Sequence, residues 1–83
     1  MRNEKLIELR LKNNLTQEEL SEKLYVAVTK VRNWEHGKTI PSIEDMEKLA
    51  EVLNVEISTI HDIFKPYHTD SHDMELNLRK KVL

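Results

Sequence analysis

Residues 15–37 of the chain read LTQEELSEKLYVAVTKVRNWEHG. Thr16 is followed three residues later by Glu19, which is the spacing of a capping box at the start of a helix. Leu20 and Leu24 lie four residues apart, so they share one stripe of that helix. Gly37 follows a second short helical pattern and suits a left-handed helix stop. The segment therefore predicts two short helices, joined by a tight turn, over residues 16–37.

The composition favours one small helical domain. The chain has 83 residues, enough for one modest core, and its single Gly and two Pro permit long helical stretches. It contains no Cys, so neither disulfides nor thiolate zinc sites can support the core. No apolar run approaches the roughly 18 residues of a membrane span, and no signal-peptide pattern opens the chain. We therefore expect a cytoplasmic protein.

Charge is distributed unevenly along the chain. The formal net charge of −2 by itself argues weakly against a nucleic-acid partner. Residues 28–40 are basic overall, whereas residues 44–62 carry mostly acidic side chains. A basic face and an acidic back would orient the molecule on a phosphate backbone. The same pattern also suits two ordinary solvated faces.

Helix punctuation predicts an all-α fold, a compact five-helix domain over residues 1–65. The predicted helices cover residues 3–13, 16–24, 28–36 and 42–54, with a fifth starting near residue 58. Asn14 and Asn54 are the expected stops of the first and fourth helices, and Ser42 with Asp45 forms a second capping box. Apolar residues at helical spacing predict the core, namely Leu6, Ile7, Leu9, Leu20, Leu24, Ile43, Met46, Leu49, Ala50, Leu53, Ile60, Ile63 and Phe64.

The helix predicted over residues 28–36 divides into two faces at about 100° per residue. One face carries Val28, Thr29, Arg32, Asn33 and His36, and the other carries Lys30, Val31, Trp34 and Glu35. The first face suits base reading, because Asn33 can pair with adenine and Arg32 with guanine or a phosphate. Val28 and the Thr29 methyl can contact thymine methyl groups. An ordinary surface helix also has a polar face, but the capped helix and tight turn before it favour DNA.

Four motifs resemble a known family. The chain has Leu-Thr-Gln-x-x-Leu at 15–20, Trp-Glu-x-Gly at 34–37, Pro-Ser at 41–42 and Leu-Ala at 49–50. Together they resemble the Cro/CI-type helix-turn-helix family, the phage-repressor and XRE group, over residues 4–64. The resemblance implies a lambda-repressor-like fold and a sequence-specific DNA-binding transcriptional regulator. Such a protein is expected to act as a repressor, placing its third helix in the major groove as a homodimer on an inverted repeat.

The resemblance also implies roles for individual residues. The base-reading positions fall on Val28, Thr29, Arg32 and Asn33, and the phosphate contacts on Gln17, His36 and Lys38. A structural ion pair is expected between Arg10 and Glu35, since the family has an Arg at the matching place in its first helix.

Three residues depart from the family pattern. Ser21 replaces an Ala where the second and third helices approach, which a small residue tolerates. Tyr25 replaces the turn Gly, which implies either strain or a rearranged turn. Ala27 replaces a capping Ser and should cost roughly 1 kcal/mol. The fold should survive, but the tilt of the third helix is open.

Residues 66–83 read as a C-terminal linker followed by an extra helix from about Ser71. Met74, Leu78 and Val82 lie at i, i+4 and i+8 on that helix, so they form an apolar stripe. The stripe suits a dimer interface, a protein partner or a tail folded back on its own domain. His68 and His72 lie four residues apart but lack a third fixed ligand, so no metal site is predicted.

The dimer and the function each leave alternatives. A second dimer surface is expected around Val55, Ile57 and Ile60. An antitoxin of a toxin–antitoxin pair would also bind DNA and would use residues 66–83 to hold a protein. A protein-interaction module that has lost DNA binding would fit the net acidity. No catalytic arrangement and no cofactor motif is recognised, so an enzyme is not expected.

Overall fold

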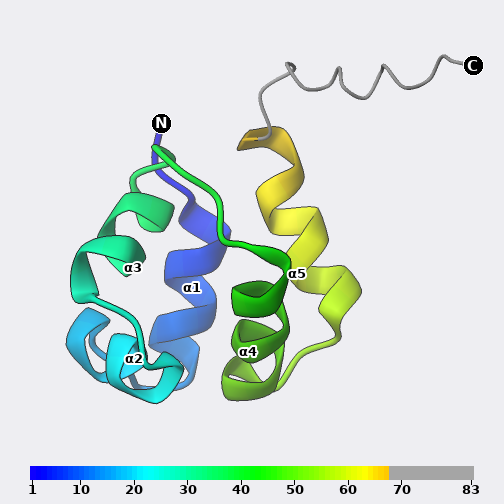
Figure 1. The fold of residues 1–83 in the computed structure, drawn as a ribbon. Helices are drawn as coiled ribbons and strands as arrows, with labels where there is room; N and C mark the ends of the chain where they lie inside the picture. The colour runs from blue at the N-terminus through cyan, green and yellow to red at the C-terminus, as the bar shows by residue number, and fades with distance from the viewer. Residues whose placement is uncertain (68–83) are drawn as a thin grey trace, which may run out of the picture.

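The computed structural model describes residues 1–67, which form five α-helices and one short 3-10 turn (Figure 1). The elements are α1 (Glu4–Lys12), α2 (Gln17–Leu24), α3 (Val28–Glu35), α4 (Ile43–Leu53), α5 (Ile57–Phe64) and η1 (Lys65–Tyr67). No strand occurs among these residues, so the predicted all-α fold class is confirmed. None of these helices is long and apolar enough to cross a membrane.

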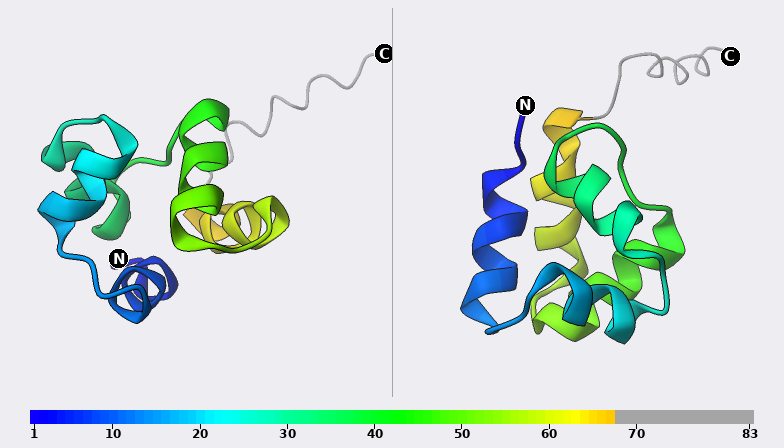
Figure 2. Two further views of the ribbon diagram at one scale, coloured as in Figure 1. Left: turned by 90° about the horizontal axis from the view of Figure 1, so that it is seen from below. Right: turned by 90° about the vertical axis from the view of Figure 1, so that its left-hand side faces the viewer.

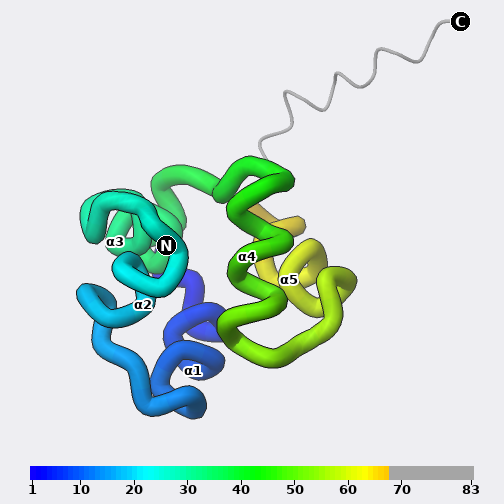
Figure 3. Tube along the Cα trace, turned by 60° about the horizontal axis from the view of Figure 1, so that its bottom comes forward, coloured from blue at the N-terminus to red at the C-terminus, as the bar shows by residue number. Residues whose placement is uncertain are grey.

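The helices pack as two pairs, and α1 lies against both of them. α2 packs against α3, α4 packs against α5, and α4 lies between the first pair and α5 (Figure 3). α1 runs beside α5 in the side view of Figure 2, where the Asn3 side chain donates to the Ile63 carbonyl at 3.2 Å. This arrangement leaves one side of α3 uncovered.

Side-chain caps define the starts of α1, α2 and α4. Thr16 and Glu19 make the predicted reciprocal capping box, with bonds of 3.0 Å and 2.9 Å. At the start of α4 the Asp45 N–H donates to Ser42 Oγ at 3.1 Å, but the Asp45 carboxylate lies 3.9 Å from Lys30 Nζ instead of returning to Ser42. The second capping box is therefore only half formed, because an Asp side chain is shorter than the Glu or Gln that completes such a box.

Left-handed residues end the helices where the sequence predicts stops. Asn14 and Asn54 both have φ 59°, and Gly37 has φ 76°. Asn tolerates this conformation better than most residues because its short polar side chain can bond locally. A Cβ at Gly37 would lie 1.9 Å from the Met1 carbonyl oxygen, so only Gly fits there. The α3 stop therefore also depends on the N-terminal segment.

One core joins all five helices of residues 1–67. Its fully buried members come from every helix: Leu6, Leu20, Leu24, Val31, Leu49, Ile60 and Phe64. The core prediction was wrong at Ile43, which is 72% exposed at the start of α4. It was right at Ile60, which is fully buried. Ile60 therefore belongs to the core and is not available to a dimer surface.

The C-terminal residues fall partly within the described fold. η1 directly follows α5, and Tyr67 Oη donates to the Arg2 carbonyl at 2.9 Å. The predicted helix from Ser71, with its Met74, Leu78 and Val82 stripe, lies outside the described residues. The His68 and His72 pair also lies outside them. The division after residue 65 stays a prediction.

Candidate nucleic-acid interface

The turn between α2 and α3 is built on a strained residue. Tyr25 is left-handed, with φ 59° and ψ 42°, and its N–H donates to the Glu22 carbonyl at 3.2 Å. Its side chain is 89% exposed, so no packing offsets the strain. Ala27 is the N-cap of α3 and makes no side-chain cap bond. The turn thus keeps the tight path that Gly would give, at a cost in stability.

Two polar side chains bond carbonyls of α2. Ser21 is buried where α2 meets α3, and its Oγ donates to the Glu18 carbonyl at 2.7 Å. Lys48 of α4 donates from Nζ to the Leu24 carbonyl at 3.3 Å, which satisfies a carbonyl at the end of α2. The orientation of the helix pair is therefore tied to α4 as well as to its own turn.

α3 has a buried face and an uncovered face. Val31, Trp34 and Glu35 are buried against the other helices. The candidate base-reading residues are exposed or half-buried, namely Val28, Thr29, Arg32 and Asn33. Lys30, on the other face of the helix, keeps its side chain 60% exposed, and its Nζ lies 3.9 Å from the Asp45 carboxylate of α4. A long side chain at the edge of the helix carries its charge outward.

A buried ion pair supports the end of α3. Arg10 Nε lies 2.6 Å from Glu35 Oε2, and the two side chains are 12% and 2% exposed. Arg10 also donates to Glu35 Oε1 at 3.2 Å and to the Leu15 carbonyl at 2.9 Å. This two-pronged pairing compensates both charges in a poorly solvated place. It joins α1 to the last residue of α3.

The ion pair extends to the surface through Gln17. Gln17 Nε2 donates to Glu35 Oε1 at 2.9 Å, and its Oε1 accepts from Arg32 Nε at 3.3 Å. Arg32 also pairs with Glu18 at 3.2 Å in an exposed contact. A continuous chain of polar contacts therefore runs from buried Arg10 to Arg32 on the uncovered face.

The C-terminal end of α3 presents two further candidates. His36 and Lys38 are both exposed, on either side of Gly37. The backbone N–H of Lys38 donates to the Asn33 carbonyl at 2.9 Å, and the Glu35 carbonyl accepts from the Asn3 N–H at 2.7 Å. Both backbone bonds hold the segment in place, so the two side chains leave the fold from a defined position next to the uncovered face of α3.

The comparison with protein families matches this geometry. A model described as helix-turn-helix matches residues 6–60, which contain α2, α3 and most of the helices around them. The chain belongs to the helix-turn-helix family. In this motif the second helix, which corresponds to α3 in this chain, is the one that enters the major groove of DNA.

One curated relative carries a functional name. The chain is 43% identical over 58 residues to the HTH-type transcriptional activator BcrR of Enterococcus faecalis. The aligned part is 70% of this chain but 28% of that protein, so the chain spans about a quarter of its relative's length. No solved structure gives a significant match.

Sequence reasoning missed two partners within this helix-turn-helix. Gln17 was considered only as a phosphate contact, yet its amide bonds Glu35, and Glu18 pairs with Arg32. Both contacts cross between α2 and α3, more than ten residues apart in sequence. The Glu18–Arg32 pair had a signal in the sequence. Glu18 is an acidic residue in the first turn of α2, and Arg32 is the basic residue in the last turn of α3.

Proposed function

We propose that this chain is a sequence-specific DNA-binding transcriptional regulator. The observation that carries the proposal is the uncovered face of α3, where Arg32 bonds Gln17 at the N-terminal end of α2 and Asn33 is half-buried. Asn33 would read adenine and Arg32 guanine, with Val28 and Thr29 against thymine methyl groups. Transcription control is drawn from the name of the relative BcrR, with which the chain shares one segment.

Phosphate contacts beside the C-terminal end of α3 would position this helix. The first N–H groups of a helix point outward and favour an anion, and Gln17 begins α2 at such a place. His36 and Lys38 would contact the opposite phosphates of the DNA backbone. Because Gln17 is already fixed by Glu35, it would meet the phosphate with little loss of side-chain freedom.

The proposed active form is a homodimer on an inverted repeat. A single α3 offers four base-reading side chains, which is a small readout for one site in a genome. Two copies related by a two-fold axis would double it, with half-sites about one helical turn apart. Val55 is half-buried and Ile57 is 37% exposed, so these two supply the proposed apolar contact around α5. Repression is the proposed mode, because it requires only that the dimer cover a promoter.

The test selects binding sites from a random double-stranded DNA library with the full chain. We expect an enriched inverted repeat, one dimer per site, and a reporter placed behind that site to lose expression when the protein is present. Enrichment of a single half-site would contradict the dimer. An increase in reporter expression would contradict repression, and failure to bind any DNA would favour a protein-interaction module.

A matched pair of variants locates the dimer surface. Ile57→Asp places a charge on the proposed interface and should abolish dimeric binding to the selected site. Leu11→Asp introduces the same charge on α1 at a side chain that is 57% exposed, and should bind as the wild type does. Equal binding by the two variants would place the interface elsewhere.

A further inference from the structure

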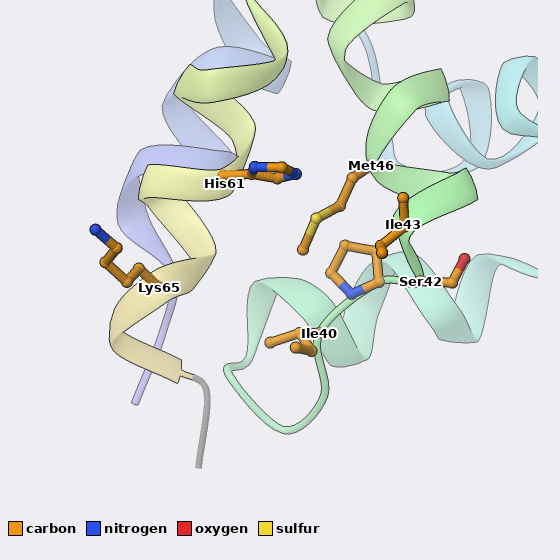
Figure 4. Close-up of a pocket in the computed structure, with 7 residues that line it drawn as sticks. Ile40, Ser42, Ile43, Met46, His61 and Lys65 are labelled. Atoms are coloured by element: carbon orange, nitrogen blue, oxygen red, sulfur yellow. The ribbon is translucent and has the colours of Figure 1, made fainter. Parts of the chain in front are cut away.

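A groove with an apolar wall opens between the start of α4 and the C-terminal half of α5 (Figure 4). Its volume is about 480 Å³. Ile40, Pro41, Ile43 and Met46 form one wall, and His61 and Lys65 stand on the other. Figure 4 shows Met46 and His61 directed into the space from opposite sides. The 72% exposure of Ile43 means that a large aliphatic surface at this groove is open to water.

The chain supplies a segment of matching chemistry at the edge of this groove. Lys65 lines the groove and begins η1, and the described residues end two positions later at Tyr67. Met74, Leu78 and Val82 are spaced to form one apolar stripe on a helix. Residues 68–70 are long enough for a tight connection, since loops of about 2–5 residues join antiparallel helices. The sequence and the groove therefore complement each other in position and polarity.

We propose that residues 71–83 dock into the groove of their own molecule as a helix antiparallel to α5. Met74, Leu78 and Val82 then cover Ile43 and Met46. A helix of this length spans about 20 Å and α5 about 12 Å, so the stripe extends along the whole groove. The docked segment also contacts Ile40 and Pro41, which belong to the connection that follows α3.

Charge favours the antiparallel direction. The segment carries its acids first and its bases last: Asp70, Asp73 and Glu75 precede Arg79, Lys80 and Lys81. In the antiparallel direction the acids lie near Lys65 at the C-terminal end of α5. The bases then lie near the exposed Glu47 and Glu51, because the short connection after α4 brings its C-terminal half beside the start of α5. The opposite direction would bring like charges together at both ends.

Hydrogen–deuterium exchange of the full chain tests the docking. In the wild type we expect amides of residues 71–83 to exchange more slowly than in an unstructured peptide of the same sequence. Ile43→Asp should accelerate this exchange on the order of tenfold to a hundredfold, because it removes an aliphatic contact and places a charge in the groove. Leu78→Asp should have the same effect from the other partner.

Leu11→Asp is the matched control, since Leu11 is exposed on α1 away from the groove, and it should leave the exchange unchanged. Unprotected amides in the wild type would overturn the proposal. So would an Ile43→Asp variant whose residues 71–83 exchange as the wild type does.

A cross-link distinguishes docking within one molecule from docking between two. The chain has no Cys, so the double variant Ile43→Cys/Leu78→Cys contains the only two thiols. Mild oxidation should produce an internally linked monomer, whereas Leu11→Cys/Leu78→Cys should form no internal link. A disulfide-linked dimer of the first variant would mean that a second copy supplies the segment, which overturns docking within one molecule.

Discussion

The side-chain amide of Gln17 donates to Glu35 Oε1 at 2.9 Å, which ties the first residue of α2 to the last residue of α3. The bond fixes which way the Gln17 amide faces, so its oxygen is left to accept from Arg32. The buried Arg10–Glu35 pair therefore orients a side chain on the uncovered face.

Glu18→Gln should strengthen DNA binding about twofold to fivefold, the range expected when one exposed ion pair is released. Arg32 pairs with Glu18 at 3.2 Å, and DNA must compete with that carboxylate for the guanidinium. Affinity for the selected site at one fixed salt concentration measures the effect. Glu22→Gln removes the same charge from the exposed side of α2, and an equal gain there would mean that net charge alone is responsible.

Arg10→Ala should lower the free energy of unfolding by about 3–5 kcal/mol, because it strands the Glu35 carboxylate at 2% exposure. Urea denaturation measures the loss. The control is Arg2→Ala, whose ion pair with Glu4 is 65% exposed on both sides and should contribute at most about 1 kcal/mol. The double variant Arg10→Met/Glu35→Met should be more stable than Arg10→Ala. If it is not, the cost does not come from an uncompensated charge.

Asn33→Ala should weaken binding to the selected DNA site by about 1–3 kcal/mol while leaving binding to random DNA nearly unchanged. Lys38→Ala should weaken both and reduce the salt dependence by about one phosphate contact. Titrations of both variants on both DNAs at several salt concentrations separate the two roles. An equal loss on both DNAs for Asn33→Ala would remove it from the base-reading set.

Tyr25→Gly should stabilise the domain by about 0.5–1 kcal/mol, because Gly takes the left-handed conformation without steric cost. The gain is partly offset, since Gly has more conformational freedom in the unfolded chain. The exposed Tyr25 ring has little packing to lose. Asn54→Gly changes another left-handed residue, and a smaller gain is expected because Asn already tolerates φ 59°. Thermal unfolding of both variants makes the comparison, and a loss at Tyr25 would show that the ring contributes contacts.

Ala27→Ser should add about 1 kcal/mol by supplying the missing cap at the start of α3. Calorimetry of the variant measures the gain. Its counterpart is Ser42→Ala, which removes an existing cap from α4 and should lose a similar amount. No change in either variant would mean that solvent already satisfies these helix ends.

Local signals predicted most of this fold. The capping box of Thr16 and Glu19, the stops at Asn14 and Asn54, and the Gly37 end depend on residues close in sequence. Spacing also placed Ile60 in the core, where it is fully buried, but the exposure of Ile43 did not follow from spacing. A helical period shows which residues share a face, but neighbouring helices decide how much of that face is covered.

At the candidate interface, too, local spacing predicted which residues share a face but not which side chains of different helices meet. The helical period placed Asn33 and Arg32 on one face of α3, and both are at least partly exposed. The bond between Gln17 and Glu35 could not be read from spacing, because it joins side chains of two helices whose angle is set by the turn at Tyr25.

Trp34 is the only Trp of the chain, and it is 2% exposed on the core face of α3. Its fluorescence therefore reports on the packing of α3 in the core, with no background from another Trp of the chain. Unfolding should shift the emission to longer wavelength as the indole meets water. The protein thus carries an intrinsic optical probe, and the stability of the proposed reading helix can be followed at low concentration without a label.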